Sequence, residues 1–182
     1  MLALFPEGFE EAERGDEFVL SAYTDAGGEA RMSAVFGAVG TGAHPTTRLC
    51  LELVSELEPG SLLDVGCGSG VIAIAAAKLG FAPVVGLDSD RHAIEAARAN
   101  AAANGFELDF RRVDARVDAL PDADVAVANI SEELVAAVAP RLSCGLLITS
   151  GYFEPHVPRL PGFRAVGRRR LDGWAADLHA PE

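Results

Sequence analysis

The sequence predicts an α/β protein with a Rossmann-like, doubly wound and mainly parallel seven-stranded sheet, an antiparallel terminal strand and a short N-terminal appendage. Apolar runs of strand length alternate with helical patterns from residue 61 to residue 152, which is typical of a parallel sheet covered by helices. A glycine-rich turn joins the first of these strands to its helix. Two closing strands, joined at Asp172-Gly173, add the antiparallel strand.

The composition fits one domain with a sizeable core, because the 182 residues are 49% hydrophobic with a mean hydropathy of +0.20. The chain has no apolar run of about 18 residues, and its N-terminus is too acidic for a signal peptide. The three cysteines are odd in number and unclustered, which favours neither a disulfide framework nor a metal site. These features predict a cytoplasmic protein.

The net charge of −12 disfavours binding to nucleic acid. The strongest local exception is Arg168-Arg169-Arg170, which we interpret as a solvated face at the end of a strand. An acidic protein of this kind attracts a basic protein partner instead.

Residues 1–38 are predicted to form a separate N-terminal segment, followed by the main domain over residues 39–182. Within the segment, Phe18–Thr24 has strand character, Asp25–Gly28 is a turn, and Glu29–Phe36 is expected to form a short helix. One strand and one helix cannot enclose a core, so this segment must pack on the main domain or on another chain.

The main domain is expected to begin with a helix after Pro45, in which Leu49, Leu53 and Leu57 recur every four residues. A buried strand over Leu62–Val65 then leads through the glycine turn to a helix ending at Lys78-Leu79. The remaining predicted elements are a strand over Pro83–Asp88, a helix from an Asp90 cap to Ala103, strands over Leu108–Asp114 and Ala123–Ile130, a helix from a Ser131 cap to Leu142, a strand over Leu146–Tyr152, and strands over Phe163–Leu171 and Trp174–His179. The three prolines of Glu154–Pro161 allow at most a short helix there.

The glycine turn has the spacing Asp64-x-Gly66-x-Gly68-x-Gly70. A dinucleotide-binding fingerprint would need Gly or Ala at position 71, where the chain has Val71. The turn resembles instead the first motif of Rossmann-like methyltransferases, which bind S-adenosylmethionine. A tight strand-to-helix turn without a ligand is the alternative interpretation.

Polar residues stand at the carboxyl ends of four predicted strands, the edge at which open α/β sheets bind ligands. Asp64 and Gly66 follow the first strand, and the other three positions are Asp88, Asp114 and Asn129. Each of them alone has an ordinary explanation as a helix cap or turn residue, but their shared position predicts a common site.

Each of these residues has a role if the ligand is S-adenosylmethionine. Asp88 lies 22 residues after Gly66, the interval at which an acidic residue accepts hydrogen bonds from ribose hydroxyls. Asp114 would accept from the adenine amino group and the Ala115 N–H would donate to the ring, while the backbone of the glycine turn would hold the methionine part. Asn129 would face the transferable methyl group.

Together with the segment GTGAHPTTRLCLEL that precedes them, these motifs resemble the ribosomal protein L11 methyltransferase family. The resemblance rests on that segment and on LLDVGCGSGVIAIAAAKLG, VVGLDSD, AIEAARANAAANG, VAVANI and ITSG, and it covers roughly residues 36–182. It implies S-adenosylmethionine as cofactor, bound near Thr47, Gly66, Asp88 and Asn129. It also implies methylation of amino groups of a large-subunit ribosomal protein. Residues 1–38 resemble a fragment of the family's N-terminal substrate-recognition domain.

The implied reaction is displacement at a sulfonium methyl group by a neutral amine, either a lysine side chain or an N-terminal α-amine. No strong general base is evident in the sequence, and we expect Asn129 to orient the amine rather than deprotonate it. His44 is the titratable candidate beside the glycine turn, with a structural cap as its other interpretation. Two alternatives remain for the function: methylation of another protein or of a small-molecule amine, and a catalytically silent S-adenosylmethionine-binding module.

Overall fold

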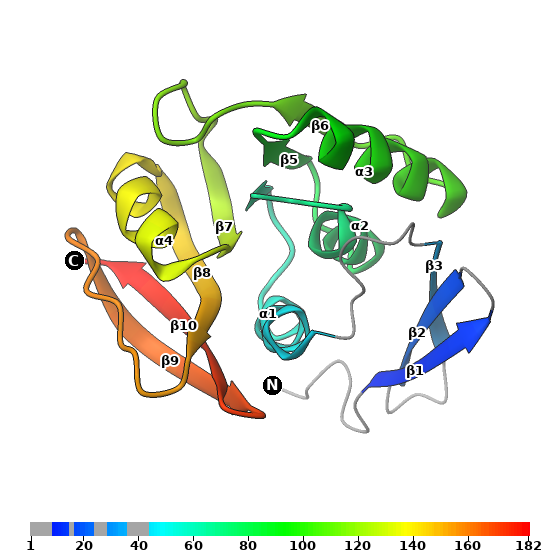
Figure 1. Cartoon of the computed structure of the whole chain (residues 1–182), viewed down its shortest axis with the longest axis horizontal. Coiled ribbons are helices and arrows are strands. Elements are labelled where there is room, and N and C mark those ends of the chain that lie inside the picture. Colours follow the sequence, from blue (N-terminus) through cyan, green and yellow to red (C-terminus); the bar gives the residue numbers. More distant parts are fainter. Residues whose placement is uncertain (1–8, 15–16, 24–28, 36–43) are drawn as a thin grey trace.

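A computed structural model describes residues 9–14, 17–23, 29–35 and 44–182, with the backbone alone for those before residue 44. Its larger sheet has seven strands in the order β6-β5-β4-β7-β8-β10-β9 (Figure 1). Their bounds are β4 (Leu62–Val65), β5 (Val84–Asp88), β6 (Asp109–Arg112), β7 (Ala123–Asn129), β8 (Cys144–Phe153), β9 (Phe163–Leu171) and β10 (Trp174–Pro181).

The strand directions confirm the predicted fold class. Strands β6, β5, β4, β7 and β8 are adjacent in that order and pair in parallel with one another. Strand β10 is antiparallel to both β8 and β9 and lies between them. The closing hairpin therefore extends the sheet beyond its parallel part, with β9 at the outer edge.

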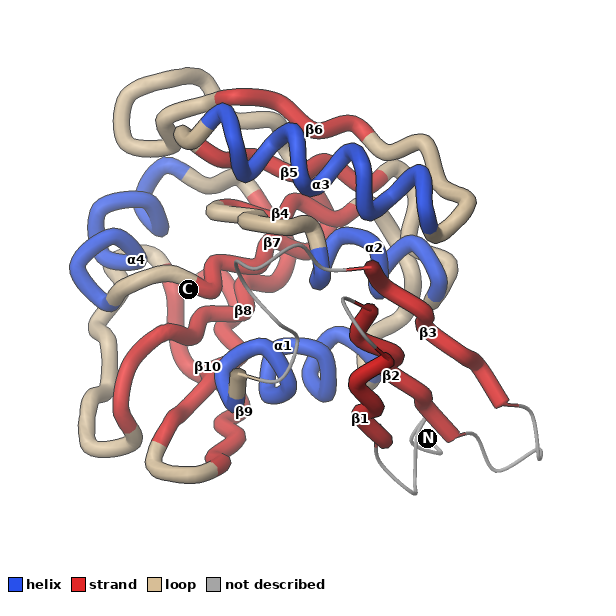
Figure 2. The backbone as a smooth tube through the Cα atoms, turned by 45° about the vertical axis from the view of Figure 1, so that its right-hand side comes forward, coloured by secondary structure: helices blue, strands red, loops and turns tan. Residues whose placement is uncertain are grey.

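Helices cover both faces of this sheet (Figure 2). They are α1 (Pro45–Ser55), α2 (Val71–Lys78), α3 (Arg91–Ala103), α4 (Glu132–Val138) and the short 3₁₀ helix η1 (Ala139–Arg141). Adjacent strand residues point to opposite faces. Accordingly, Leu62 packs in the core under α1, α2 and α3, whereas Leu63 packs in the core under α4.

The helix starts follow the predicted capping residues. Asp90 accepts a hydrogen bond from the backbone N–H of His92 at 2.9 Å, and Ser131 accepts one from Leu134 N–H at 3.5 Å. The helix after Ser131 was expected to reach Leu142, but the α-helix ends at Val138. Pro140 has no N–H for the next helical bond, so the chain continues as a 3₁₀ turn.

The N-terminal residues form a three-stranded antiparallel sheet of β1 (Phe9–Arg14), β2 (Glu17–Tyr23) and β3 (Glu29–Val35). The helix predicted over Glu29–Phe36 is therefore wrong. Apolar and polar residues alternate along EARMSAV, a period of two that favours a strand, and this strand pairs with β2 along its length. The proposed division between residues 38 and 39, like the Gly40-Thr-Gly42 motif, lies outside the described residues.

Arg168, Arg169 and Arg170 of β9 do not form a free basic surface. Arg169 pairs with both carboxylate oxygens of Glu56, and Arg170 pairs with Glu154; all four of these side chains are at least 40% exposed. Arg168 differs from the predicted solvated face, because its side chain is only 16% exposed and lies beside Asp177. Each charge is thus already matched by a carboxylate.

Within the described part of the chain, no helix combines the length and the apolar character needed to cross a membrane. The same residues contain no group of three or more His, Cys, Asp or Glu placed to hold a metal ion.

Phe110 is a sensitive test of the core, since its ring is 2% exposed and packs with the residues under α2 and α3. We expect Phe110→Ala to lower the free energy of unfolding by about 3–5 kcal/mol through lost burial and a residual cavity. Val166→Ala, at a 46% exposed position of β9, should stay within about 0.5 kcal/mol. Urea unfolding measures both, and similar losses in the two variants would contradict this account.

Candidate functional site

Two neighbouring cavities open at the carboxyl ends of the parallel strands. The first has a volume of about 630 Å³ and the second about 290 Å³, and both are lined by Gly66 and Ile130, where they meet. The first is also lined by His44, Thr46, Thr47, Asp64, Cys67, Gly68, Ser69, Val71, Ile72, Asn129, Ser131, Gly151 and Trp174. The second is also lined by Val65, Leu87, Asp88, Ser89, Val113, Asp114, Ala115, Arg116, Leu134 and Val138.

The glycine turn between β4 and α2 separates the two cavities. The N–H groups of Gly66 and Cys67 both donate to the carbonyl oxygen of Leu87, at 2.7 and 2.9 Å, which fastens the turn to the end of β5. Gly66 has a φ of +72°. A side chain there would start 2.3 Å from Cγ2 of Ile130, so the residue must be glycine for both conformational and steric reasons.

Asp88 supports the same turn from the end of β5. Its Oδ2 accepts a hydrogen bond from the Gly68 N–H at 3.0 Å, and its Oδ1 accepts one from the Asp90 N–H at 2.9 Å. Each carboxylate oxygen keeps further acceptor capacity toward the second cavity. Sequence reasoning anticipated the position of Asp88 but not its hold on the glycine turn.

Asp64 brings a buried carboxyl group to the first cavity. It is 1% exposed, and its Oδ2 accepts a hydrogen bond from the Ala73 N–H in the first turn of α2 at 3.2 Å. Burial raises the pKa of Asp64 to about 7, with a smaller contribution from the nearby charge of Asp88, while the bond from Ala73 acts in the opposite direction. The cavity therefore contains an acid that titrates near neutral pH.

Asn129 and Thr47 meet across the first cavity from distant parts of the sequence. The Asn129 amide nitrogen lies 3.3 Å from Thr47 Oγ1 and donates to it. Because the amide nitrogen makes this contact, the amide oxygen takes no part in it and can accept a different hydrogen bond.

His44 caps α1, as one of its two interpretations expected, and it also lines the first cavity. Its Nδ1 accepts from the Thr46 N–H at 3.4 Å and lies 2.8 Å from Thr46 Oγ1. An Nδ1 that accepts from a backbone N–H places the proton of the neutral ring on Nε2. The ring meets Trp174 edge to face, with 4.8 Å between the ring centroids.

Asp114 and Ala115 line the second cavity, but the Asp114 carboxylate already has a partner. Arg116 donates from Nε at 2.9 Å and from Nη2 at 2.7 Å, and these bonds lower the pKa of Asp114 to about 2. Arg141 donates to the carbonyl of Ala115 at 2.9 Å. Neither arginine was considered as a site residue from the sequence.

Gly70 is the one predicted site residue outside both cavities. It begins α2 with a φ of +83°, and a side chain there would lie 3.0 Å from Phe110 and 3.1 Å from Ala97. Its position indicates a role in helix packing.

The residues of the first cavity that the sequence analysis did not assign to the site include Ile130, Gly151 and Trp174. Gly151 has a φ of +101°, and a side chain there would come within 2.0 Å of the carbonyl oxygen of Ile130. Gly151 follows the ITS run of β8, and Trp174 is the one tryptophan of the chain. The sequence offered two signals for these residues: a glycine near the end of a predicted strand, and a single tryptophan directly after a turn.

Comparison with known proteins identifies the family. The sequence model for the ribosomal protein L11 methyltransferase (PrmA) matches residues 36–156. This range includes every predicted site residue. The chain belongs to the ribosomal protein L11 methyltransferase family.

Curated relatives in this family cover most of the chain. It is 39% identical over 154 residues to a ribosomal protein L11 methyltransferase of Symbiobacterium thermophilum, and the match covers 78% of this chain and 51% of the relative. The corresponding protein of Cupriavidus taiwanensis is 45% identical over 154 residues, again with 78% and 51% covered. The chain thus spans about half the length of the curated relatives it matches.

Solved structures agree with this family assignment. A ribosomal protein L11 methylase from Lactobacillus delbrueckii subsp. bulgaricus superposes with a TM-score of 0.71 at 29% identity, covering 78% of this chain and 81% of that chain. TrmN from Thermus thermophilus superposes with a TM-score of 0.58 at 26% identity, covering 73% of this chain and 47% of that chain.

The buried Asp64 predicts a specific pH dependence of stability. Between about pH 4 and about pH 7 the folded state holds a proton on this group that the unfolded state has released, so folding stability falls as the pH rises through that range. Asp64→Asn keeps an oxygen for the Ala73 N–H but removes the titration. The variant should therefore lose less stability than the wild type between these pH values, by up to about 4 kcal/mol.

Urea unfolding at several pH values measures this difference. Because the other titrating groups are common to both proteins, their contributions cancel in the comparison. Parallel pH profiles would show that Asp64 is ionised throughout.

Proposed function

We propose that this chain binds S-adenosylmethionine and transfers its methyl group to amino groups of a protein, with ribosomal protein L11 as the substrate. The observation that carries the proposal is the convergence of Thr47, Asn129 and the glycine turn on one cavity. The choice of protein is supported by the relatives, which are ribosomal protein L11 methyltransferases. With a ribosomal protein as substrate, the reaction would take place in the cytoplasm.

The chemistry of the two cavities fits this cofactor. In the second cavity, Asp88 offers carboxylate oxygens for ribose hydroxyls, and the Asp114–Ala115 segment would border the adenine. In the first cavity, the buried carboxyl of Asp64 and the turn from Gly66 to Gly68 suit the charged methionine part of S-adenosylmethionine. When bound, S-adenosylmethionine supplies an electrophilic methyl group.

The acceptor must arrive as a neutral amine. Loss of the proton from a lysine side chain at pH 7 costs about 4.6 kcal/mol, and loss from an N-terminal α-amine costs about 1 kcal/mol. Alignment of the reacting groups can contribute roughly 7–11 kcal/mol, which exceeds either cost. The site can therefore operate by desolvation and orientation, with the proton released to water.

Asn129 is the residue that would orient the amine. Its NH₂ group donates to Thr47, which leaves the carboxamide oxygen to accept an amine N–H and direct the nitrogen lone pair. His44 does not suit the role of base, because its Nδ1 accepts from the helix N-terminus and its Nε2 carries the proton. We assign His44 to the cavity wall.

The acidic surface of the chain supports a basic protein partner. A net charge of −12 attracts a positively charged ribosomal protein and repels free nucleic acid. The pairing of Arg169 with Glu56 and of Arg170 with Glu154 means that these two exposed arginines of β9 are already matched by carboxylates.

Binding of S-adenosylhomocysteine, measured by calorimetry, tests the cofactor proposal. Asp88→Ala should weaken it by about 10- to 100-fold, the value of a hydrogen bond to a charged group. Asp109→Ala is the matched control, because Asp109 pairs with Arg111 at the exposed start of β6 and borders neither cavity. Equal affinity in the two variants would refute the assignment of the second cavity.

Methyl transfer from labelled cofactor to purified ribosomal protein L11 tests the proposed reaction. We expect Asn129→Ala to lower kcat by about 100-fold through loss of alignment, while the affinity for S-adenosylhomocysteine changes much less. Asn104→Ala removes an amide at the end of α3 and should leave kcat unchanged. Cofactor binding without any transfer in the wild type would favour the silent binding module, and transfer to other amines alone would favour another substrate.

A further inference from the structure

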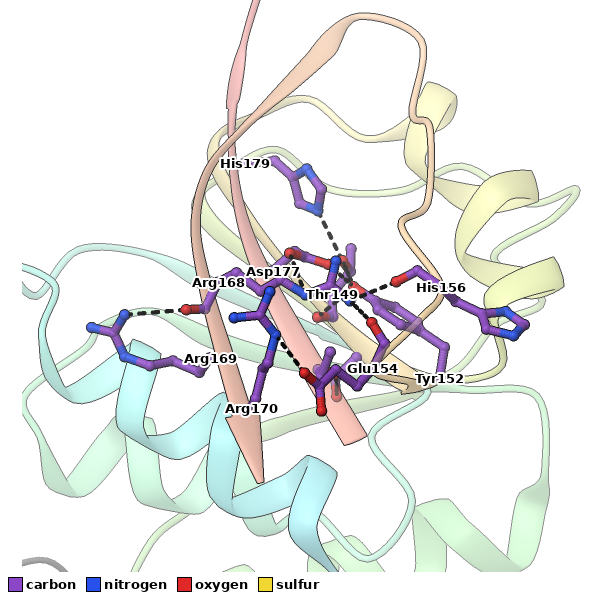
Figure 3. A network of polar contacts seen from close by, with 11 residues as sticks. Thr149, Tyr152, Glu154, His156, Arg168, Arg169, Arg170, Asp177 and His179 are labelled. Carbon is purple, nitrogen blue, oxygen red and sulfur yellow. Dashed lines mark hydrogen bonds and ion pairs between the residues drawn. The ribbon is translucent and has the colours of Figure 1, made fainter. Parts of the chain in front are cut away.

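A buried polar network joins the last three strands of the sheet (Figure 3). Thr149 and Tyr152 come from β8, and Asp177 and His179 come from β10; each is at most 3% exposed. None of the four lines either cavity. Polar groups buried this fully are costly unless they satisfy one another, so their arrangement calls for an explanation.

The hydrogen bonds run in one direction toward Asp177. The Tyr152 hydroxyl donates to Asp177 Oδ2 at 2.8 Å, so it accepts from Thr149 Oγ1 at 2.7 Å. Thr149 Oγ1 in turn accepts from His179 Nε2 at 2.9 Å. Burial lowers the pKa of His179, which keeps its ring neutral, and the chain ends on the charged carboxylate.

Arg168 completes the network from β9. Its Nε lies 3.7 Å from the second oxygen of Asp177, and its Nη2 donates to the carbonyl oxygens of Glu154 at 2.8 Å and His156 at 2.5 Å. Arg168 therefore fastens the start of the proline-rich segment after β8 to the middle of β10. The same segment is tied to the first turn of α4, where His156 Nδ1 lies 2.5 Å from Glu132 Oε2.

The network reaches the first cavity through its immediate neighbours in sequence. Tyr152 stands between Gly151, which lines the cavity, and Phe153, which stacks on Trp174 with 4.3 Å between ring centroids. Across the strands, Trp174 pairs with Phe153 and Ala175 pairs with Tyr152, and the register shifts directly after Ala175. The position of Trp174 thus depends on how β8 and β10 are held at this bulge.

We infer that Arg168 and the Tyr152–Asp177 pair are positioning residues, which set Trp174, stacked on Phe153, as the substrate-side wall of the first cavity. An apolar core would hold the strands together without the cost of a buried carboxylate and a partly buried guanidinium. The charged groups also fix a geometry. The planar guanidinium of Arg168 fits only one placement of the segment that begins with Phe153 and Glu154. The effect on methyl transfer rests on the proposed function, whereas the effect on Trp174 does not.

Trp174 is the one tryptophan of the chain, so its fluorescence reports directly on the wall. Arg168→Met should shift its emission to longer wavelength, increase its quenching by acrylamide and lower the melting temperature. In the double variant Arg168→Met/Asp177→Asn, neither charge of the pair remains, and the carboxamide that replaces the carboxylate can still accept from Tyr152. This double variant should recover most of the melting temperature but not the wild-type fluorescence, because the carbonyls of Glu154 and His156 still lack their donor.

The kinetic consequence separates positioning from stability. In the double variant, the KM for ribosomal protein L11 should rise about 10-fold, with kcat and the affinity for S-adenosylhomocysteine within about 3-fold of the wild type. Arg169→Met is the matched control on the neighbouring residue, since it removes only the exposed pair with Glu56. It should leave fluorescence and kinetics unchanged.

The outcomes are distinguishable. Recovery of the fluorescence together with the melting temperature in the double variant would reduce the network to a structural role and overturn the inference. The same fluorescence change in Arg169→Met would also overturn it. If Arg168→Met does not fold, Arg168→Lys keeps the charge but loses the fork and should give the same change in Trp174. Absence of methyl transfer in the wild type would refute the proposed function, while the fluorescence would still decide the positioning.

Discussion

The close approach of Ile130 to two glycines is the constraint on which the site depends. The side chain of Ile130 lies over Gly66 at the end of β4, and its carbonyl oxygen lies over Gly151 in β8. Both contacts are too short for any side chain at the glycine positions, and both glycines have positive φ values. As a result, the ends of three adjacent strands come together at backbone distance and divide the ligand space into two cavities.

The two cavities differ in the origin of their polar groups. The second cavity takes its carboxylates from β5 and from the turn after β6, and these carboxylates also hold the local backbone. The first cavity combines the N-terminus of α1, the glycine turn, the end of β7 and the hairpin strand β10. It thus receives residues from elements that are far apart in sequence. Family membership and this geometry are the two grounds for the proposal that a methyl donor spans both cavities and an acceptor amine reaches the first.

The closing hairpin has a larger role than its position at the end of the chain suggests. Strand β10 enters between β8 and β9, and its first residue, Trp174, becomes part of the cavity wall. The partly buried Arg168 and the buried Asp177 lie side by side on β9 and β10 (Figure 3). An exposed ion pair such as Arg169–Glu56 contributes little to stability, but a buried pair with a fixed fork can specify one arrangement of strands and loop.

The sequence by itself determined the alternation of strands and helices, the caps at Asp90 and Ser131, and the placement of Asp64, Asp88, Asp114 and Asn129 at one edge of the sheet. These features follow from local periodicity and from the rule that parallel strands end at a common edge. The alternation in EARMSAV was also readable, although we predicted a helix there. Only the tertiary structure decided that Arg116 pairs with the Asp114 carboxylate, that Asn129 contacts Thr47, and that Ile130, Gly151 and Trp174 form part of the cavity wall. Such contacts join residues up to 82 positions apart, and they depend on strand order and packing, which local patterns do not encode.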